Sequence, residues 1–217
     1  MFRSILYTQW KWARVALLVI AVAAVAVPVG SVRAIGGVVI STSVGDALNT
    51  MRVWSVLYVL LAALAGLILA ISAWAADQRG HHVYALSLPV PRWHYVLLRF
   101  AAGLALLLVP ALLVWLGALI ASAIVVLPAG LATYPGALAL RWLLAAFVAY
   151  ALFFAISSGT ARTAGLVLGV IAGIVAADLM LALMDQPAVV IEFVVSKFFE
   201  WPGVFEVFTG RWMLIDV

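Results

Sequence analysis

Long apolar segments dominate this chain and restrict the folds that it can adopt. Five of them cover residues 15–32, 53–76, 95–127, 141–156 and 163–184. A helix needs about 20 mostly apolar residues to cross the roughly 30 Å hydrocarbon core of a bilayer. Only 9% of the residues are charged, whereas a water-soluble domain carries about 25%. We therefore predict an all-α, polytopic membrane protein, a single transmembrane domain over residues 1–217 with five to six spanning helices.

Amphipathic segments precede and follow these apolar stretches. In residues 1–14 a helix would separate two faces, one with Phe2, Ile5, Leu6, Trp10 and Ala13, the other with Arg3, Ser4, Tyr7, Thr8, Lys11 and Arg14. Such a helix suits the inner leaflet, with its cations toward anionic lipid; the alternative is an extension of the first span.

The segment 185–217 has a polar stripe of Glu192, Ser196 and Glu200 at helical spacing. Its apolar run is too short to cross a bilayer, so we expect an extracytoplasmic interfacial or re-entrant helix. No sixth apolar stretch follows by Val217, so either the bundle has five spans or a sixth lies beyond Val217.

Basic residues set the expected orientation, because Lys and Arg collect on the cytoplasmic side of a membrane. With the N-terminus inside, the inner segments hold seven basic residues and the outer segments hold five. This majority predicts a cytoplasmic N-terminus. The inner group is Arg3, Lys11, Arg14, Arg79, Arg92, Arg99 and Arg162, and the outer group is Arg33, Arg52, Arg141, Lys197 and Arg211.

A polar segment, DQRGHHVYALSLPVPRWHYVLLR, joins the second and third apolar stretches and contains all three histidines. Asp77 suits the N-cap of a short helix over residues 78–87, and Pro89 and Pro91 suit the first turn of the next helix. Arg92, Trp93 and Arg99 would anchor that next helix at the inner membrane edge. Asp77 could bind a metal together with the two histidines that follow it, His81 and His82. No further ligand is near, however, and we predict no metal site.

Two features of the fifth apolar stretch concern packing and polarity. Gly165, Gly169 and Gly173 recur every four residues, a spacing that lets a neighbouring helix approach closely. We expect an intramolecular neighbour, with a subunit interface as the alternative. Asp178 is the one acidic residue deep in this stretch. We expect its carboxylate to reach water at the outer end of the helix, and the alternative is a polar site in a cavity.

The sequence lacks the motifs of familiar enzymes. It has no G-x-x-x-x-G-K-[ST], no H-E-x-x-H, no G-x-S-x-G and no cysteine. The chain therefore cannot cradle ATP phosphates in the Walker manner, and familiar hydrolase chemistry is not expected. We predict that it is not an enzyme and holds no cofactor.

The polar segment resembles the loop between spans two and three in membrane subunits of type-2 ATP-binding-cassette (ABC) exporters. That family loop reads approximately E-R-E-x-G-T, a hydrophobic run, then S-x-P-[VI]-x-R and a basic residue. The chain departs from this pattern where Gln78 replaces the second glutamate and His81 replaces the threonine. The matching residues here are Gly80, Val83, Tyr84, Ala85, Leu86, Ser87, Leu88, Pro89, Val90, Pro91, Arg92 and Arg99.

The resemblance implies that this loop, residues 77–92, carries a coupling helix that contacts a partner ATPase. The contact residues would be Gln78, Arg79, Gly80, His81, His82, Val83, Tyr84, Ala85, Leu86 and Ser87. The turn that contains Ser158, Thr160 and Arg162 is similar to the family's second cytoplasmic loop.

The resemblance also implies a set of partners and a location. The ABC ATPase subunit would bind ATP and Mg, and a second permease copy or a homologous permease would complete the transporter. The location would be the bacterial cytoplasmic (inner) membrane, with no nucleic-acid partner. Two alternatives stay open: a membrane assembly or scaffold protein without transport, and an ion- or proton-conducting protein that uses Asp178.

Overall fold

The computed structural model of the protein describes residues 1–36, 44–79, 91–125, 131–159, 161–183, 189–200, 202–209, 212 and 214–216. Its elements in chain order are α1 (Phe2–Gly36), α2 (Val44–Arg79), α4 (Arg92–Ile124), β1 (Ala132–Thr133), α5 (Pro135–Ser158), α6 (Ala161–Leu183), α7 (Val189–Phe198), the 3-10 turn η1 (Glu206–Phe208) and β2 (Ile215–Asp216).

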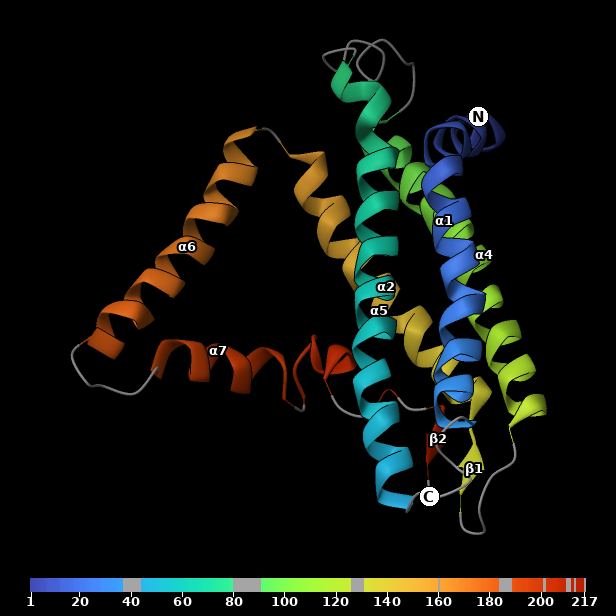
Figure 1. Ribbon diagram of the computed structural model, residues 1–217. Helices are drawn as coiled ribbons and strands as arrows, with labels where there is room; N and C mark the ends of the chain where they lie inside the picture. The colour runs from blue at the N-terminus through green and yellow to red at the C-terminus, as the bar shows by residue number, and fades with distance from the viewer. Residues whose placement is uncertain are drawn as a thin grey trace.

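Four long helices, α1, α2, α4 and α5, pack side by side as a bundle (Figure 1). Helices α2 and α4 each contact both α1 and α5. All four are long and apolar enough to cross a membrane. The predicted helical architecture is confirmed in this coarse form, with one short strand pair added. Helix α6 coincides with the fifth apolar stretch; that it forms a fifth span stays a prediction.

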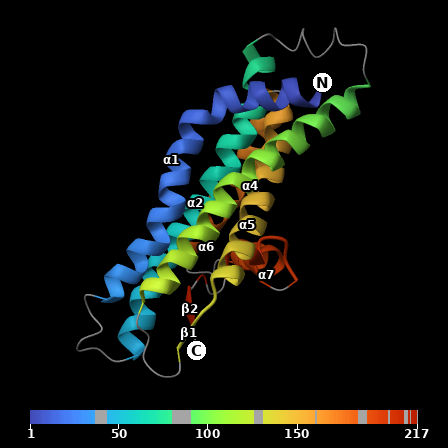
Figure 2. The same cartoon turned by 90° about the vertical axis from the view of Figure 1, so that its right-hand side faces the viewer.

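Helix α1 is continuous but bent (Figure 2). Its 35 residues extend over about 50 Å at 1.5 Å per residue, more than one crossing needs. The first part lies across the end of the bundle and the rest runs along it. Gln9 and Ala13 of this first part are buried, whereas Phe2 and Trp10 of the expected apolar face are exposed.

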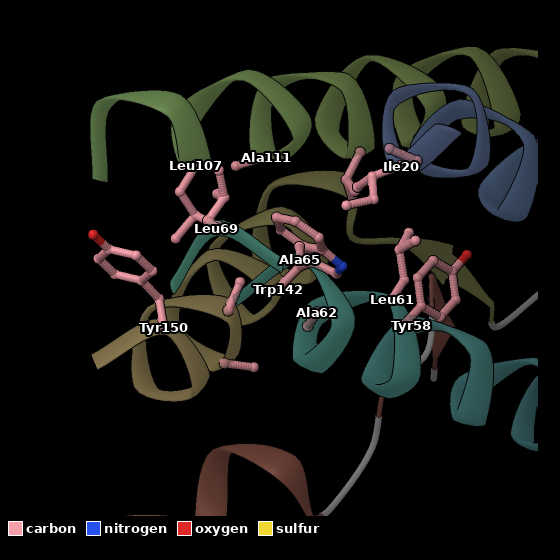
Figure 3. Close-up of a cluster of buried hydrophobic side chains, with 14 of the residues drawn as sticks. Ile20, Tyr58, Leu61, Ala62, Ala65, Leu69, Leu107, Ala111, Trp142 and Tyr150 are labelled. Atoms are coloured by element: carbon pink, nitrogen blue, oxygen red, sulfur yellow. The ribbon is translucent and has the colours of Figure 1, made fainter. Parts of the chain in front are cut away.

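Small side chains let the helices of the bundle approach closely. Ala62 and Ala65 of α2 are fully buried beside the Trp142 ring of α5 (Figure 3). Gly66 has the backbone of Tyr150 against it, because an added Cβ would lie 2.6 Å from the Tyr150 nitrogen. In lipid no hydrophobic force drives helices together, so this van der Waals contact stabilises the bundle. The α2–α5 interface is therefore fixed by small residues.

Helix α6 diverges from the bundle, and α7 returns toward it (Figure 1). After α7, the chain reaches the bundle end that holds the start of α5, where β2 pairs antiparallel with β1. Trp212, Leu214 and Ile215 are buried in the core there. The predicted C-terminal interfacial segment thus comprises a ten-residue helix, α7, and a strand docked on the bundle.

Arg141 attaches this C-terminal strand segment to α5. Its guanidinium donates hydrogen bonds to the carbonyl oxygens of Val207, at 3.3 Å, and of Thr209. The same group lies 5.5 Å from the centre of the Trp212 ring, within the range of a cation–π contact. Arg141 therefore contacts three residues of the returning chain.

We expect a disulfide to form between β1 and β2 in the variant Thr133→Cys/Ile215→Cys. The two residues are register partners. The Tyr134 amide donates to the Leu214 carbonyl at 2.9 Å, so the adjacent pair is the non-hydrogen-bonded one, where side chains are closest. The natural chain has no cysteine, so the product is read directly from proteolytic fragments on non-reducing gels. The off-register variant Ala132→Cys/Ile215→Cys is the control, and equal cross-linking in both would contradict this strand pairing.

Candidate functional site

A buried ion pair joins α2 and α4 at the bundle end where the polar loop begins and finishes. Asp77 lies in the last turn of α2 and Arg99 lies two turns into α4. Arg99 Nη2 is 2.9 Å from Asp77 Oδ1, and the two side chains are 6% and 2% exposed. The loop between residues 77 and 99 is therefore closed at its base by opposite charges.

Further groups hydrogen-bond to this pair, and only Arg99 Nε is buried without a partner among its nitrogen atoms. Arg99 Nη2 donates to the Tyr95 hydroxyl at 2.5 Å, and that hydroxyl lies 3.2 Å from Asp77 Oδ2, to which it donates. Arg99 Nη1 donates to the Ala73 carbonyl oxygen. The guanidinium also lies 4.7 Å from the Tyr95 ring centre and 5.3 Å from that of Trp74. Hydrogen bonds and aromatic faces thus offset much of the cost of burying two charges.

The remaining two bundle helices reach the same place through the backbone of α4. Gln9 of α1 donates from Nε2 to the Arg99 carbonyl at 3.1 Å. The Tyr150 hydroxyl of α5 donates to the Phe100 carbonyl at 3.2 Å. Gly103 makes room for this hydroxyl, because an added Cβ would lie 2.0 Å from it. All four long helices therefore meet at one cluster, which we call the four-helix junction: Gln9, Asp77, Tyr95, Arg99 and Tyr150.

Among the predicted anchor residues, some are exposed and one is buried. Arg92 and Trp93 are exposed at the start of α4, and the Trp93 ring stacks on His94 at 5.4 Å. Arg99 was expected at the membrane edge, but it lies inside the bundle. Asp77 belongs to α2 and is not the N-cap of a separate helix, because α2 continues to Arg79.

Most of the predicted coupling-helix contacts lie outside the described residues. Gln78 and Arg79 form the end of α2, and the structure describes only their backbone. The others lie outside the described residues, as does one of the predicted anchors: Gly80, His81, His82, Val83, Tyr84, Ala85, Leu86, Ser87 and Pro89.

The predicted second loop joins α5 to α6, and the end of α5 lies at the same end of the bundle as the end of α2 (Figure 1). Ser158 ends α5 and is exposed, with its hydroxyl donating to the Ala155 carbonyl at 2.7 Å. Thr160 lies outside the described residues, and Arg162 belongs to α6 with an undescribed side chain. The helix ends that flank the two loops therefore share one end of the bundle.

Helix α6 carries the predicted packing glycines and the single deep acid. A Cβ added at Gly169 or Gly173 would meet no atom within 4 Å, so the expected intramolecular neighbour is not found among the described residues. Gly165 lies in α6 but its surroundings are not described. Asp178 is only 4% exposed, so protein encloses its carboxylate where we expected access to water.

Sequence reasoning missed the partners of Arg99. None of these partners stands out in the sequence: Gln9 lies in the amphipathic segment 1–14, Tyr95 begins the third apolar stretch and Tyr150 lies within the fourth. One signal was present: an acid ends α2 and a base follows in the first turns of α4, and such charges are costly near lipid unless paired.

The arrangement has the character of a mechanical junction, since it holds four helices in fixed register. Among the described residues, no group of three metal-ligating side chains comes together. Comparison of the chain with models of protein families, with characterised proteins and with solved structures found no match to any of them.

Proposed function

We propose that the chain is the membrane-spanning permease subunit of an ATP-driven ABC exporter. The observation that supports this most is the Asp77–Arg99 pair, 2.9 Å long and buried. It fixes both ends of the polar loop to each other, and that loop carries the resemblance to a coupling helix. A loop that transmits force needs such a rigid base.

The four-helix junction offers a route for that force. A push on the loop by a partner ATPase would act on α2 through Asp77 and on α4 through Arg99. Gln9 and Tyr150 hold the α4 backbone at Arg99 and Phe100, so α1 and α5 would follow. Displacement of one loop would thus tilt the bundle as a unit and move substrate outward.

Two further points support an ATPase bound at this end. The end of α5 lies at the same end of the bundle as the end of α2 and the start of α4 (Figure 1), so one partner could contact the segments that follow α2 and α5. The chain itself has no Walker motif, so ATP and Mg would be bound by the partner. A second permease copy would complete the transport path.

We expect Tyr84→Pro to abolish coupling while leaving the bundle folded. Proline inside a helix destabilises that helix by about 3 kcal/mol or more. Residue 84 is central in the proposed coupling helix. The measurement is ATP-dependent transport and ATPase activity in vesicles that contain the chain and its co-expressed ABC ATPase. Arg92→Glu should weaken coupling as well, because it reverses an exposed charge at the base of the loop.

The matched control is Arg33→Glu, an exposed arginine at the opposite end of the bundle. If no ATPase co-purifies with the chain, or if Tyr84→Pro and Arg33→Glu behave alike, the proposal is wrong. A partner that lacks a nucleotide site would favour a scaffold function. Ion flux in vesicles without ATP, lost in Asp178→Asn, would favour conduction, which the burial of Asp178 keeps open as a second candidate.

A further inference from the structure

A cluster of exposed cations surrounds the bundle end that holds the four-helix junction. Arg3, Lys11 and Arg14 are exposed on the first part of α1, and Arg92 is exposed at the start of α4. Among the described residues, the acid at this end is Asp77, and Arg99 neutralises it. The exposed charge there is therefore positive and unopposed within the described chain.

Aromatic rings are interleaved with these cations. Tyr7 is 67% exposed, Trp10 is 43% exposed and Trp93 is 66% exposed. Exposed tryptophan and tyrosine prefer the headgroup level of a bilayer, where the ring is apolar and its N–H or O–H meets water. We call the set Arg3, Tyr7, Trp10, Lys11, Arg14, Arg92 and Trp93 the basic-aromatic collar.

The collar is held in a fixed orientation. The first part of α1 lies across the bundle end (Figure 2). Gln9 fastens it to α4 through the 3.1 Å bond to the Arg99 carbonyl, and Ala13 is 1% exposed beneath it. The cations on the opposite side of this helix consequently face outward, and the backbone that carries them does not need to be ordered when a ligand binds.

The collar continues directly into a lipid-facing surface. Immediately after Arg14, α1 exposes only apolar side chains on its outer face, with Val15 at 69%, Leu18 at 65% and Val19 at 66% exposure. A soluble acidic partner could pair with the cations but would leave the aromatic rings and the adjacent apolar face uncovered. An anionic phospholipid meets both, since its phosphate binds the cations while its acyl chains cover the apolar face.

We propose that the basic-aromatic collar is a binding site for anionic phospholipid headgroups. Each cation close to an anionic surface strengthens binding about fivefold at low salt. The site should bind phosphatidylglycerol more tightly than phosphatidylcholine of the same acyl composition, because only phosphatidylglycerol carries a net negative charge. The test of this site needs no ATPase, because the variants change Arg3 and Arg14 and leave Arg92 intact.

The test compares two charge-neutralised variants of the purified full-length chain. Arg3→Gln/Arg14→Gln removes two collar arginines, and Arg33→Gln/Arg52→Gln removes two exposed arginines at the opposite end. Dioleoylphosphatidylglycerol and dioleoylphosphatidylcholine are titrated into each, and bound lipid is counted by native mass spectrometry. We expect the collar variant to lose roughly 25-fold in preference for phosphatidylglycerol, and the control variant less than twofold.

Three other outcomes would contradict the proposal that the collar binds lipid headgroups. Equal losses in the two variants would mean general attraction to a basic protein, and no loss in either would remove the collar as a lipid site. Inorganic phosphate that competes as well as the lipid would assign the cations to a free anion instead. Circular dichroism confirms that both variants are folded, and neither readout depends on the proposed transport activity.

Discussion

Replacing Asp77 by leucine is expected to lower the free energy of unfolding by about 3–5 kcal/mol, because it leaves Arg99 charged and buried without its counter-ion. The pair is 2.9 Å long and both side chains are almost fully enclosed. The Tyr95 hydroxyl and the Ala73 carbonyl still accept from the guanidinium, but neither carries charge. Arg99→Met should cost a similar amount, since it leaves a buried carboxylate.

The double variant Asp77→Leu/Arg99→Met should recover most of this loss. Apolar residues of similar volume often replace a buried ion pair at little or no cost in stability. The measurement is denaturant unfolding of the purified protein, with Arg92→Gln as the control. Arg92 is exposed, so its neutralisation should change the unfolding free energy by no more than about 0.5 kcal/mol. Single variants that lose less than about 1 kcal/mol would contradict the burial of this pair.

The same double variant separates stability from function. An apolar pair can hold α2 against α4, but it lacks the directional hydrogen bonds through Tyr95. The two helices can therefore shift along each other. If the loop transmits force, the double variant should fold and bind the ATPase while transporting poorly. Full transport activity in the double variant would mean that the ion pair serves the fold alone.

Much of the helical frame could be predicted from hydropathy and from local rules. The start of α4 at Arg92 follows from the two prolines before it, since proline favours the first turn of a helix. The start of α5 was placed six residues late, at Arg141 instead of Pro135. A basic residue was read there as a membrane edge, whereas its guanidinium is covered by the Val207 and Thr209 carbonyls of the returning chain.

The junction itself could not be predicted, because it depends on tertiary contacts. Asp77 and Arg99 are 22 residues apart, and Gln9 is 90 residues from the carbonyl that it binds. Helical periodicity shows which face of a helix is apolar but not which helix will cover it. Gly66 of α2 lies against the backbone of α5, whereas a Cβ added at Gly169 or Gly173 of α6, where the spacing also suits close packing, meets no atom within 4 Å.

Gly66→Ala is the second change with a large expected effect, a loss of about 2–3 kcal/mol in the free energy of unfolding. The added Cβ would lie 2.6 Å from the Tyr150 nitrogen, 2.9 Å from the Ala146 carbonyl oxygen and 2.7 Å from the Ala149 Cβ. Two of these atoms are backbone, so α2 and α5 must move apart along the whole interface. The higher helix propensity of alanine, about 1 kcal/mol, offsets only part of this cost.

Gly173→Ala is the matched control, because the same substitution in α6 meets no atom within 4 Å and should be neutral or stabilising by up to about 1 kcal/mol. A second comparison identifies the cause. At Gly103 the clash is with the Tyr150 ring, so Tyr150→Leu should relieve Gly103→Ala. It should not relieve Gly66→Ala, whose obstacle is the Tyr150 backbone. Rescue of both by Tyr150→Leu, or equal stability of Gly66→Ala and Gly173→Ala, would show that α2 and α5 do not approach as closely as this packing requires.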